Sequence, residues 1–573
     1  MSSSRLSGLA TTIMKSIKYI RCAAFSLLLI GLATLVNAQT IPVGTPFLED
    51  YYRREQLLGR LDSSISFNVR PISAAALGVD DIYRLDDQGT STSILWQDYD
   101  GRSKVQLMPV SMRYQYNSTY PYGWNDGAMI PARGHQVMAS AGIFANFRFF
   151  SIQLNPEVVL AENRTYEGYG GAEGPTRTWY SQLGNRIDMP ELFGNGGYSR
   201  VLPGQSSVRL TLDPVSLGVS TENLWWGPGR LNSILMSNTA AGFAHITLNT
   251  TRPIRTYIGS FEGQVVSGRI EHSDYPPSLL GNTSVHMEYL RDKPDTWRYF
   301  SGIVLSYQPR WVPGFNVGFA RSFLTAGKPT FNSLRDYLPI LLPASKKGVS
   351  DDSESSDGYD QQISVFFRWA VPAAHAEIYG EYARNDHAWD YRDLTVQLDH
   401  TRAYTVGLRK LVPLASHNES FLQLSGEVTQ LAVTNTRRIR AAGSWYLHGN
   451  YGYTHQGQLL GAGIGPGSNL QAVDVSWLRG INQVGLRFER LVHNEDFANR
   501  TYNEFRNNWV DASFDAYVKW RFNRILASAN LQYIHAYNYQ YNFTAPSNEA
   551  DYWDFDPQDK NNLRLRLGVM YMF

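Results

Sequence analysis

Two adjacent tryptophans followed by a glycine-rich turn are the residues of this chain best suited to contact a ligand. Because Gly-Pro-Gly follows them, the tryptophans are expected at a strand end, where the backbone enters a turn that glycine adopts easily. Indole faces can stack on sugar C–H faces while amides and a guanidinium add hydrogen bonds. The candidate glycan-binding residues are Asn223, Trp225, Trp226, Arg230 and Asn238. Alternatively, the tryptophans pack a protein interior or anchor it at a membrane interface, and the residues alone favour this role.

The other reactive residue types form no recognisable catalytic, metal or nucleotide site. His448 and His455 lie in one expected loop, and Asp511 and Asp515 share one expected strand face, but no GxSxG nucleophile motif accompanies them. There is also no HExxH motif, and the GAGIGPG stretch from Gly461 lacks the βαβ setting of a phosphate loop. The sequence therefore predicts a protein that is not an enzyme and that has no cofactor and no metal site.

The amino-terminal segment has the features of a signal peptide. Basic residues precede an apolar run from Cys22 to Val36, which is shorter than the roughly 20 residues that span a bilayer. Small residues before Gln39 place the expected cleavage after Ala38, so residues 1–38 are the predicted signal peptide. Cleavage removes four basic residues and the single cysteine, which changes the formal charge from +1 to −3. No nucleic-acid partner is expected for such a chain.

Apolar and polar residues alternate through most of the remaining chain. The last segment places apolar residues on one face at every second position, namely Leu563, Leu565, Leu567, Val569, Tyr571 and Phe573. Similar segments start as early as Val105, and each has about the 9 to 11 residues with which a tilted strand crosses a membrane. Together with the terminal aromatic residue, this pattern predicts an all-β fold: a transmembrane antiparallel β-barrel of about 18 strands in a bacterial outer membrane.

Loop lengths give the expected orientation, because bacterial barrels have short turns on the periplasmic side. Counting back from the C-terminus predicts short turns at 522–524, 479–481, 411–419 and 370–373, and long external segments at 538–562, 492–510, 432–469, 385–401 and 324–360. Thr45 and Pro46 form a good helix start, and Phe47 to Leu61 has a helix-forming composition with interspersed charges. Residues 39–62 are therefore expected as a small periplasmic helical element, packed under or into a barrel formed by residues 63–573.

The strand faces expected to point inward carry charges of both signs. Such a mixture favours ion pairs across a filled lumen, whereas an open porin often has segregated charges at its constriction. These residues are Arg368, Glu377, Glu381, Arg409, Glu427, Arg487, Glu489, Asp515, Lys519 and Arg566.

Three blocks of the chain resemble the capsule assembly protein Wzi family. They are YPYGWNDGAMIPARG from Tyr120, ENLWWGPGRLNSILMSN from Glu222 and TRPIRTYIG from Thr251, of which the WWGPG part is the most specific. The resemblance covers most of the mature chain in order and layout. It implies an outer-membrane barrel of about 18 strands with a periplasmic helical element, acting as a surface lectin that retains capsular polysaccharide. This chain departs from the family in having less helix before its first strands and longer loops.

The sequence and the resemblance together predict an outer-membrane protein that binds capsular or extracellular polysaccharide and helps to attach or assemble it at the cell surface. Many weak contacts between aromatic, Asn- and Asp-rich loops and a polymer can sum through multivalency. The expected partners are the polysaccharide, outer-membrane lipids and the polysaccharide export machinery. The alternative function is a porin-like diffusion channel for sugars or small solutes.

Overall fold

The structure is a computed structural model that describes residues 39–84, 93–169, 186–275, 297–326, 359–385, 390–414, 419–433, 444–448, 451–502, 505–544, 553 and 555–573. The predicted signal peptide and most of the predicted loop 324–360 lie outside these residues.

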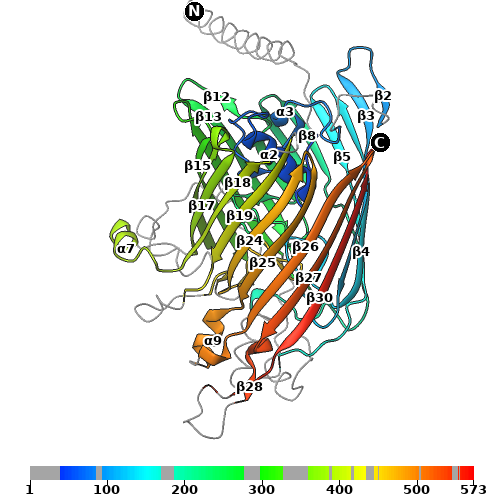
Figure 1. The fold of residues 1–573 in the computed structure, drawn as a ribbon. Coiled ribbons are helices and arrows are strands. Elements are labelled where there is room, and N and C mark those ends of the chain that lie inside the picture. The colour runs from blue at the N-terminus through cyan, green and yellow to red at the C-terminus, as the bar shows by residue number, and fades with distance from the viewer. Residues whose placement is uncertain are drawn as a thin grey trace, which may run out of the picture.

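The described strands close into an 18-stranded antiparallel barrel, which confirms the predicted fold (Figure 1). The last strand pairs with the first, with Tyr571 opposite Val110, so the wall has no free edge between them. Two positions in the barrel wall are each occupied by two short strands, β5 with β6 and β7 with β8. β4 pairs with both β5 and β6, β5 pairs with β8, and β6 pairs with β7. In chain order the wall consists of β3 (Ser103–Asn117), β4 (Gly134–Phe147), β5 (Phe150–Leu154), β6 (Glu157–Ala161), β7 (Tyr198–Leu202), β8 (Ser207–Leu212), β9 (Val215–Ser220), β11 (His245–Thr250), β12 (Ile254–Arg255), β13 (Gly259–Ile270), β14 (Arg298–Pro309), β15 (Phe315–Ala326), β16 (Tyr359–Val371), β17 (Ala376–Asn385), β18 (Arg402–Pro413), β19 (Ser420–Gln430), β24 (Asn469–Arg479), β25 (Asn482–Val492), β26 (Val510–Phe522), β27 (Ile525–Tyr537) and β30 (Lys560–Tyr571).

The outside of the wall is apolar, as the alternation predicts. Its exposed side chains include Val365, Phe367, Val473, Val475, Leu486, Phe514, Leu531 and Leu567. Trp369, Trp477 and Trp520 each lie two residues from the end of their strand on the side of the short turns. Tyr533 and Tyr537 lie toward the opposite end of β27. An apolar surface between two aromatic rims suits a bilayer, whose hydrocarbon core and interfaces these residue types prefer.

The two ends of the barrel differ in the length of their connections. Two residues join β26 to β27 and β24 to β25, while η5 (Pro372–Ala374) lies in the short turn between β16 and β17. These turns lie at the same end as the C-terminus, whereas α7, α9 and β28 lie at the other (Figure 1). The predicted division into short turns and long loops is confirmed for the described connections. The long loops carry α7 (Tyr391–Val396), β20 (Leu447–His448), β21 (Tyr451–Gly452), β22 (Thr454–His455), β23 (Gln458–Leu459), α9 (Glu495–Thr501), η6 (Phe505–Asn507), η7 (Tyr539–Tyr541), β28 (Phe543–Thr544) and β29 (Asp556–Pro557).

The lumen is filled by the chain itself. The N-terminal segment 39–84 contributes α2 (Pro46–Leu57), β1 (Val69–Arg70) and α3 (Ala74–Leu77), and β10 (Trp225–Trp226) pairs with β1. Side chains of this segment form hydrogen bonds with strands on several sides of the barrel. Thr40 bonds to β5, Asn68 to β14, Arg53 to β17 and Arg54 to β25. None of the described helices is long and apolar enough to cross a membrane.

The boundary expected after residue 62 falls inside this lumenal segment. Residues 63–84 continue this lumenal segment, which together with residues 222–244 we call the plug. The first long strand of the wall begins at Ser103 and pairs with the short strand β2 (Ile94–Gln97). The difference has a physical reason, since Ser66 and Asn68 are buried and hydrogen-bonded to β13 and β14 as lumenal residues are. A sequence pattern does not distinguish such a polar segment from loops between strands.

A charge on the apolar outer surface should destabilise the inserted barrel. Leu531 is the middle residue of β27 and its side chain is 48% exposed. We expect Leu531→Arg to lower the free energy of unfolding by about 2–4 kcal/mol, because it places a cation in the hydrocarbon core. Urea unfolding in phospholipid vesicles measures the change, and Leu531→Met is the control. Equal stability of the Arg and Met variants would contradict the placement of this face in lipid.

Candidate functional site

Trp226 packs in the apolar interior of the plug. Its ring is fully buried against Phe300 of β14, with ring centroids 6.2 Å apart, and its indole Nε1 donates to Gln264 of β13 at 2.9 Å. Asn223 is also buried and uses both ends of its amide, accepting from Gln205 at 2.8 Å and donating to the Ala240 carbonyl at 2.7 Å. These two candidate residues are therefore occupied within the protein.

The turn after the tryptophans needs its glycines. Gly227 has φ +109°, and a Cβ there would lie 3.0 Å from a carboxylate oxygen of Glu381. A Cβ on Gly229 would lie 1.8 Å from the Asn232 carbonyl oxygen. The turn is fixed by Glu427 of β19, whose carboxylate accepts from the backbone N–H groups of residues 230, 231 and 232 at 2.8, 3.1 and 2.9 Å. This part of the block is explained by close packing.

Trp225, Arg230 and Asn238 line one internal cavity of about 380 Å³ between the plug and the wall. The guanidinium of Arg70 lies over the Trp225 ring, 4.7 Å from its centroid, while Trp225 Nε1 has no hydrogen-bond partner among the described residues. The Arg230 side chain donates to Ser425 at 3.0 Å, and the Asn238 amide donates to the Asn125 carbonyl at 3.0 Å. Three of the five candidates thus meet at a single space.

Helix α2, which forms one side of this cavity, is held to the wall by buried ion pairs. The carboxylate of Glu377 in β17 contacts Arg53 of α2 at 3.0 Å, Arg368 at 2.7 Å and Arg409 at 2.9 Å. From the helix side, Asp50 contacts Arg54, Arg409 and Arg230 at 2.7, 2.9 and 3.4 Å. The inward charges predicted to pair across the lumen do so at this network.

The network also sets the protonation of the acidic residues on α2. Burial alone would raise the pKa of Asp50, but Arg409, Arg230 and Arg54 hold it well below its usual value. The neighbouring Glu49 shows the opposite balance, because burial raises its pKa and Arg70, 3.4 Å away, only partly opposes this. Asp50 is consequently a fixed anion of the plug.

A second group of aromatic residues lies at the end of the barrel with the long loops. We call Tyr169, Phe497, Tyr502, Trp509 and Tyr541 the loop-end aromatic cluster. Trp509 stacks on His493 with ring centroids 3.8 Å apart, and its Nε1 donates to Asp511 at 2.8 Å. Trp509 and Tyr502 remain partly exposed while the other rings support them. The cluster presents aromatic surface in a fixed orientation, which suits stacking on a sugar.

Sequence reasoning missed this cluster and the basic residue Arg113, which lines the cavity from β3. Trp509 and Tyr169 are far apart in the sequence, and no motif marks them. Arg113 comes next to the cavity only through strand register. In the described part of the chain, no group of three or more His, Cys, Asp or Glu residues is arranged to hold a metal ion.

Comparison with known proteins identifies one family and one fold. The model of the family "capsule assembly protein Wzi" matches residues 123–547. The outer-membrane protein Wzi of Escherichia coli, a carbohydrate-binding β-barrel involved in group 1 capsule assembly, is similar in structure with a TM-score of 0.57 at 12% identity, covering 93% of this chain and 99% of that one. Pseudomonas aeruginosa OpdQ aligns with a TM-score of 0.37 at 9% identity, covering 82% of this chain and 98% of that one. None of the curated protein sequences matches the chain.

Replacing Asp50 should loosen the plug. In Asp50→Asn, three guanidiniums lose a shared carboxylate, and we expect a loss of about 3–5 kcal/mol in stability at neutral pH. Because the folded pKa of Asp50 is depressed, its contribution is complete above the unfolded value of about 3.9 and is lost as the pH falls through the folded pKa. The variant should therefore lack that part of the acid destabilisation seen in the wild type.

Urea unfolding, followed by tryptophan fluorescence at a series of pH values, checks this. The control is Asp399→Asn, which removes a carboxylate whose side chain is 71% exposed and should change little. Wild-type stability of Asp50→Asn at neutral pH would show that the network does not hold the plug.

Proposed function

We propose that this chain, which belongs to the capsule assembly protein Wzi family, binds capsular or extracellular polysaccharide at the bacterial outer membrane and helps to attach or assemble it at the cell surface. The family match over residues 123–547 and the common fold with the carbohydrate-binding Wzi of Escherichia coli support this function. The apolar outer wall, with its aromatic rims, is consistent with contact to outer-membrane lipids.

The filled lumen is the observation that favours binding over diffusion. Segments 39–84 and 222–244 occupy the interior, and α2 is tied to β17 and β18 through Glu377 and Arg409. A diffusion channel needs a continuous water-filled path, whereas a binding protein needs a rigid support for its loops. The plug gives the barrel that rigidity.

The loop-end aromatic cluster is the surface at which we expect the polymer to bind. Short turns in bacterial barrels lie in the periplasm, so the end with α9 and β28 faces the outside of the cell (Figure 1). Trp509 and Tyr502 offer partly exposed rings there, and repeated sugar units can engage several barrels at once. Binding of this kind requires no bond-making step, and we propose that the protein acts without catalysis.

The opposite end of the barrel is where export machinery would dock. The plug lies toward the end with the C-terminus, so residues near α3 and the first turns face the periplasm (Figure 1). A polymer delivered from that side by an export complex would be retained by loops on the other side. No nucleic-acid partner is part of this proposal.

Loss of the Trp509 ring should weaken polysaccharide binding. We expect Trp509→Ala to bind purified capsular polysaccharide about fivefold to tenfold more weakly, because one stacking surface is removed. When expressed in cells whose own gene is deleted, the variant should retain less polymer at the surface than the wild-type protein does. Surface plasmon resonance and the ratio of cell-bound to released polysaccharide are the measurements.

Trp311→Ala is the matched control, because Trp311 is 71% exposed in a short turn at the periplasmic end. It should bind and retain polymer like wild type. If the gene deletion leaves retention unchanged, or if both variants behave alike, the surface-binding proposal is wrong.

The same proposal predicts that the protein does not conduct ions across a bilayer. In planar bilayers the full protein should give no stable current steps, because the plug closes the lumen. Discrete steps that grow with salt concentration would instead establish the channel function.

A further inference from the structure

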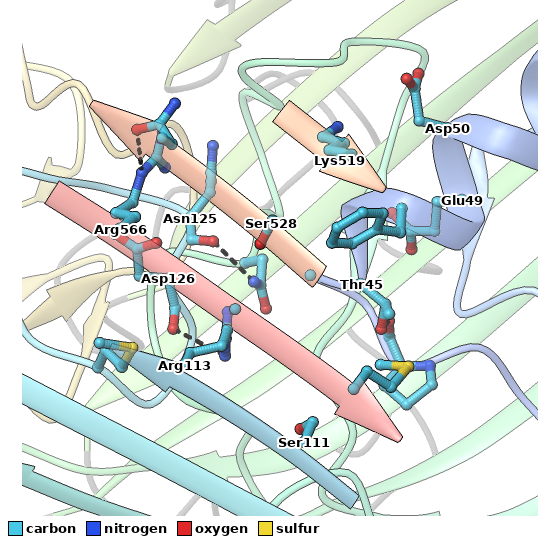
Figure 2. A pocket seen from close by; sticks show the side chains of 18 of the residues that line it. Thr45, Glu49, Asp50, Ser111, Arg113, Asn125, Asp126, Lys519, Ser528 and Arg566 are labelled. Atoms are coloured by element: carbon cyan, nitrogen blue, oxygen red, sulfur yellow. Dashed lines mark hydrogen bonds between the residues drawn. The ribbon is translucent and has the colours of Figure 1, made fainter. Parts of the chain in front are cut away.

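The internal cavity has a floor of two small residues between two cations. Strand register places Arg113 of β3 opposite Gly568 of β30, Gly568 opposite Ser528 of β27, and Ser528 opposite Lys519 of β26. These four lie in one row across adjacent strands, with the two basic residues roughly 14 Å apart at three strand spacings. Because the glycine and serine side chains in the middle of the row are small, space remains between the wall and α2 (Figure 2).

Neither of these cations forms an ion pair within the described part of the chain, although Asp50 acts on Lys519 and Glu157 on Arg113 electrostatically at longer range. Arg113 donates only to the Asp126 carbonyl and the Met138 sulfur, at 3.4 and 3.3 Å, and has no carboxylate partner. Lys519 lies over the rings of Phe47 and Tyr517, 5.7 Å from each centroid, and forms no ion pair with a described residue. The six other basic side chains that line the cavity all have ion-pair partners, as Arg564 has in Asp126 at 2.6 Å. The two cations therefore retain unused binding capacity.

The cavity as a whole carries an excess of positive charge. Its lining contains eight basic and six acidic side chains. One of the acids, Glu49, is a weak counter-charge, since burial raises its pKa. A space of this character attracts anions, and an anionic group would lie beside the two cations without ion-pair partners.

The remaining lining residues suit the neutral part of a sugar. Trp225 presents a buried indole whose Nε1–H lacks a partner in the described structure. Ser528 adds a hydroxyl group, and Figure 2 shows Ser528 and Asn125 beside the same space as Thr45 at the N-terminus of α2. A volume of about 380 Å³ lies in the range of small-molecule pockets. It admits a monosaccharide rather than a polymer chain.

We propose that this cavity is a binding site for a single acidic sugar unit, whose carboxylate or phosphate lies over Gly568 and Ser528 between Arg113 and Lys519. The inference rests on the proposed function for the class of ligand, and it places a second site inside the barrel, separate from the loop-end aromatic cluster. An inorganic anion shares the charged group but not the sugar ring, so the two sources are separable by experiment.

Saturation-transfer NMR on the mature protein in detergent tests the site, with galacturonate and galactose as probes. Wild type should saturate galacturonate but not galactose, and phosphate should compete. Lys519→Gln and Arg113→Gln should each weaken galacturonate binding by about tenfold, the loss of one charge-assisted contact. Lys519→Arg should retain binding, and Ser528→Leu should abolish it by filling the floor. Lys410→Gln, on an exposed side chain of β18, is the control.

Equal transfer to both sugars, or transfer that survives Lys519→Gln and Ser528→Leu, would overturn the proposal. If calorimetry detects phosphate binding but NMR detects no saturation transfer to galacturonate, the proposal is also overturned, because the site would then bind inorganic anions only. Trp509→Ala separates this inference from the proposed function. It should weaken polymer binding and keep galacturonate binding. Polymer binding by the wild type without any galacturonate signal would leave the surface function intact and reject the internal site.

Discussion

The carboxylate of Glu377 is the point on which the interior of this protein depends. It lies on β17, completely buried, and three guanidiniums surround it, one of them from the plug helix α2. Burying a carboxylate is unfavourable unless it is paired, and burying three arginines without a carboxylate would cost more free energy still. Wall and plug are therefore mutually required: β16 and β18 bring Arg368 and Arg409, and α2 brings Arg53. Asp50 repeats the arrangement from the side of the plug, as one plug acid among three guanidiniums. Ion pairs of this kind fix where the helix lies more than they add net stability.

That fixed helix determines what the rest of the lumen can do. With α2 against β16, β17 and β18, the segment after Asn223 folds back beside β1, and Glu427 captures its turn through three backbone N–H groups. The cavity lies where α2 faces β26, β27, β30 and β3, and Asp50, Arg53 and Arg230 of the network line it. The charged network and the cavity thus both follow from one helix placement. Close packing of α2 against β16, β17 and β18 leaves the cavity between α2 and the strands opposite. The plug also supports the wall that carries the long loops.

The sequence predicts the wall well, because the wall obeys a local rule. Leu563 to Phe573 and Ile525 to Tyr533 alternate with period two, and their pairing follows from short turns, so strand number, outer face and loop direction can all be deduced. The interior obeys no local rule. Nothing in the residues 63–84 distinguishes a lumenal segment from a loop, and the convergence of Arg113, Gly568, Ser528 and Lys519 depends on the register of four strands. The loop-end aromatic cluster is equally invisible, since Tyr169 and Trp509 meet only after the barrel has closed.

The tryptophan block shows how a specific motif can mark architecture more than ligand contact. Packing alone accounts for most of its residues: Trp226 fills a hole beside Phe300 and satisfies Gln264, Gly227 adopts a positive φ next to Glu381, and Gly229 touches the Asn232 carbonyl. Trp225 is the exception. Packing against Arg70 explains its ring but not its indole N–H, which is buried at the cavity without a partner. A buried donor left unpaired costs about 1–3 kcal/mol, so a phenylalanine would serve the packing as well at lower cost. The acidic sugar proposed for the cavity would supply the hydrogen-bond acceptor that this indole N–H lacks.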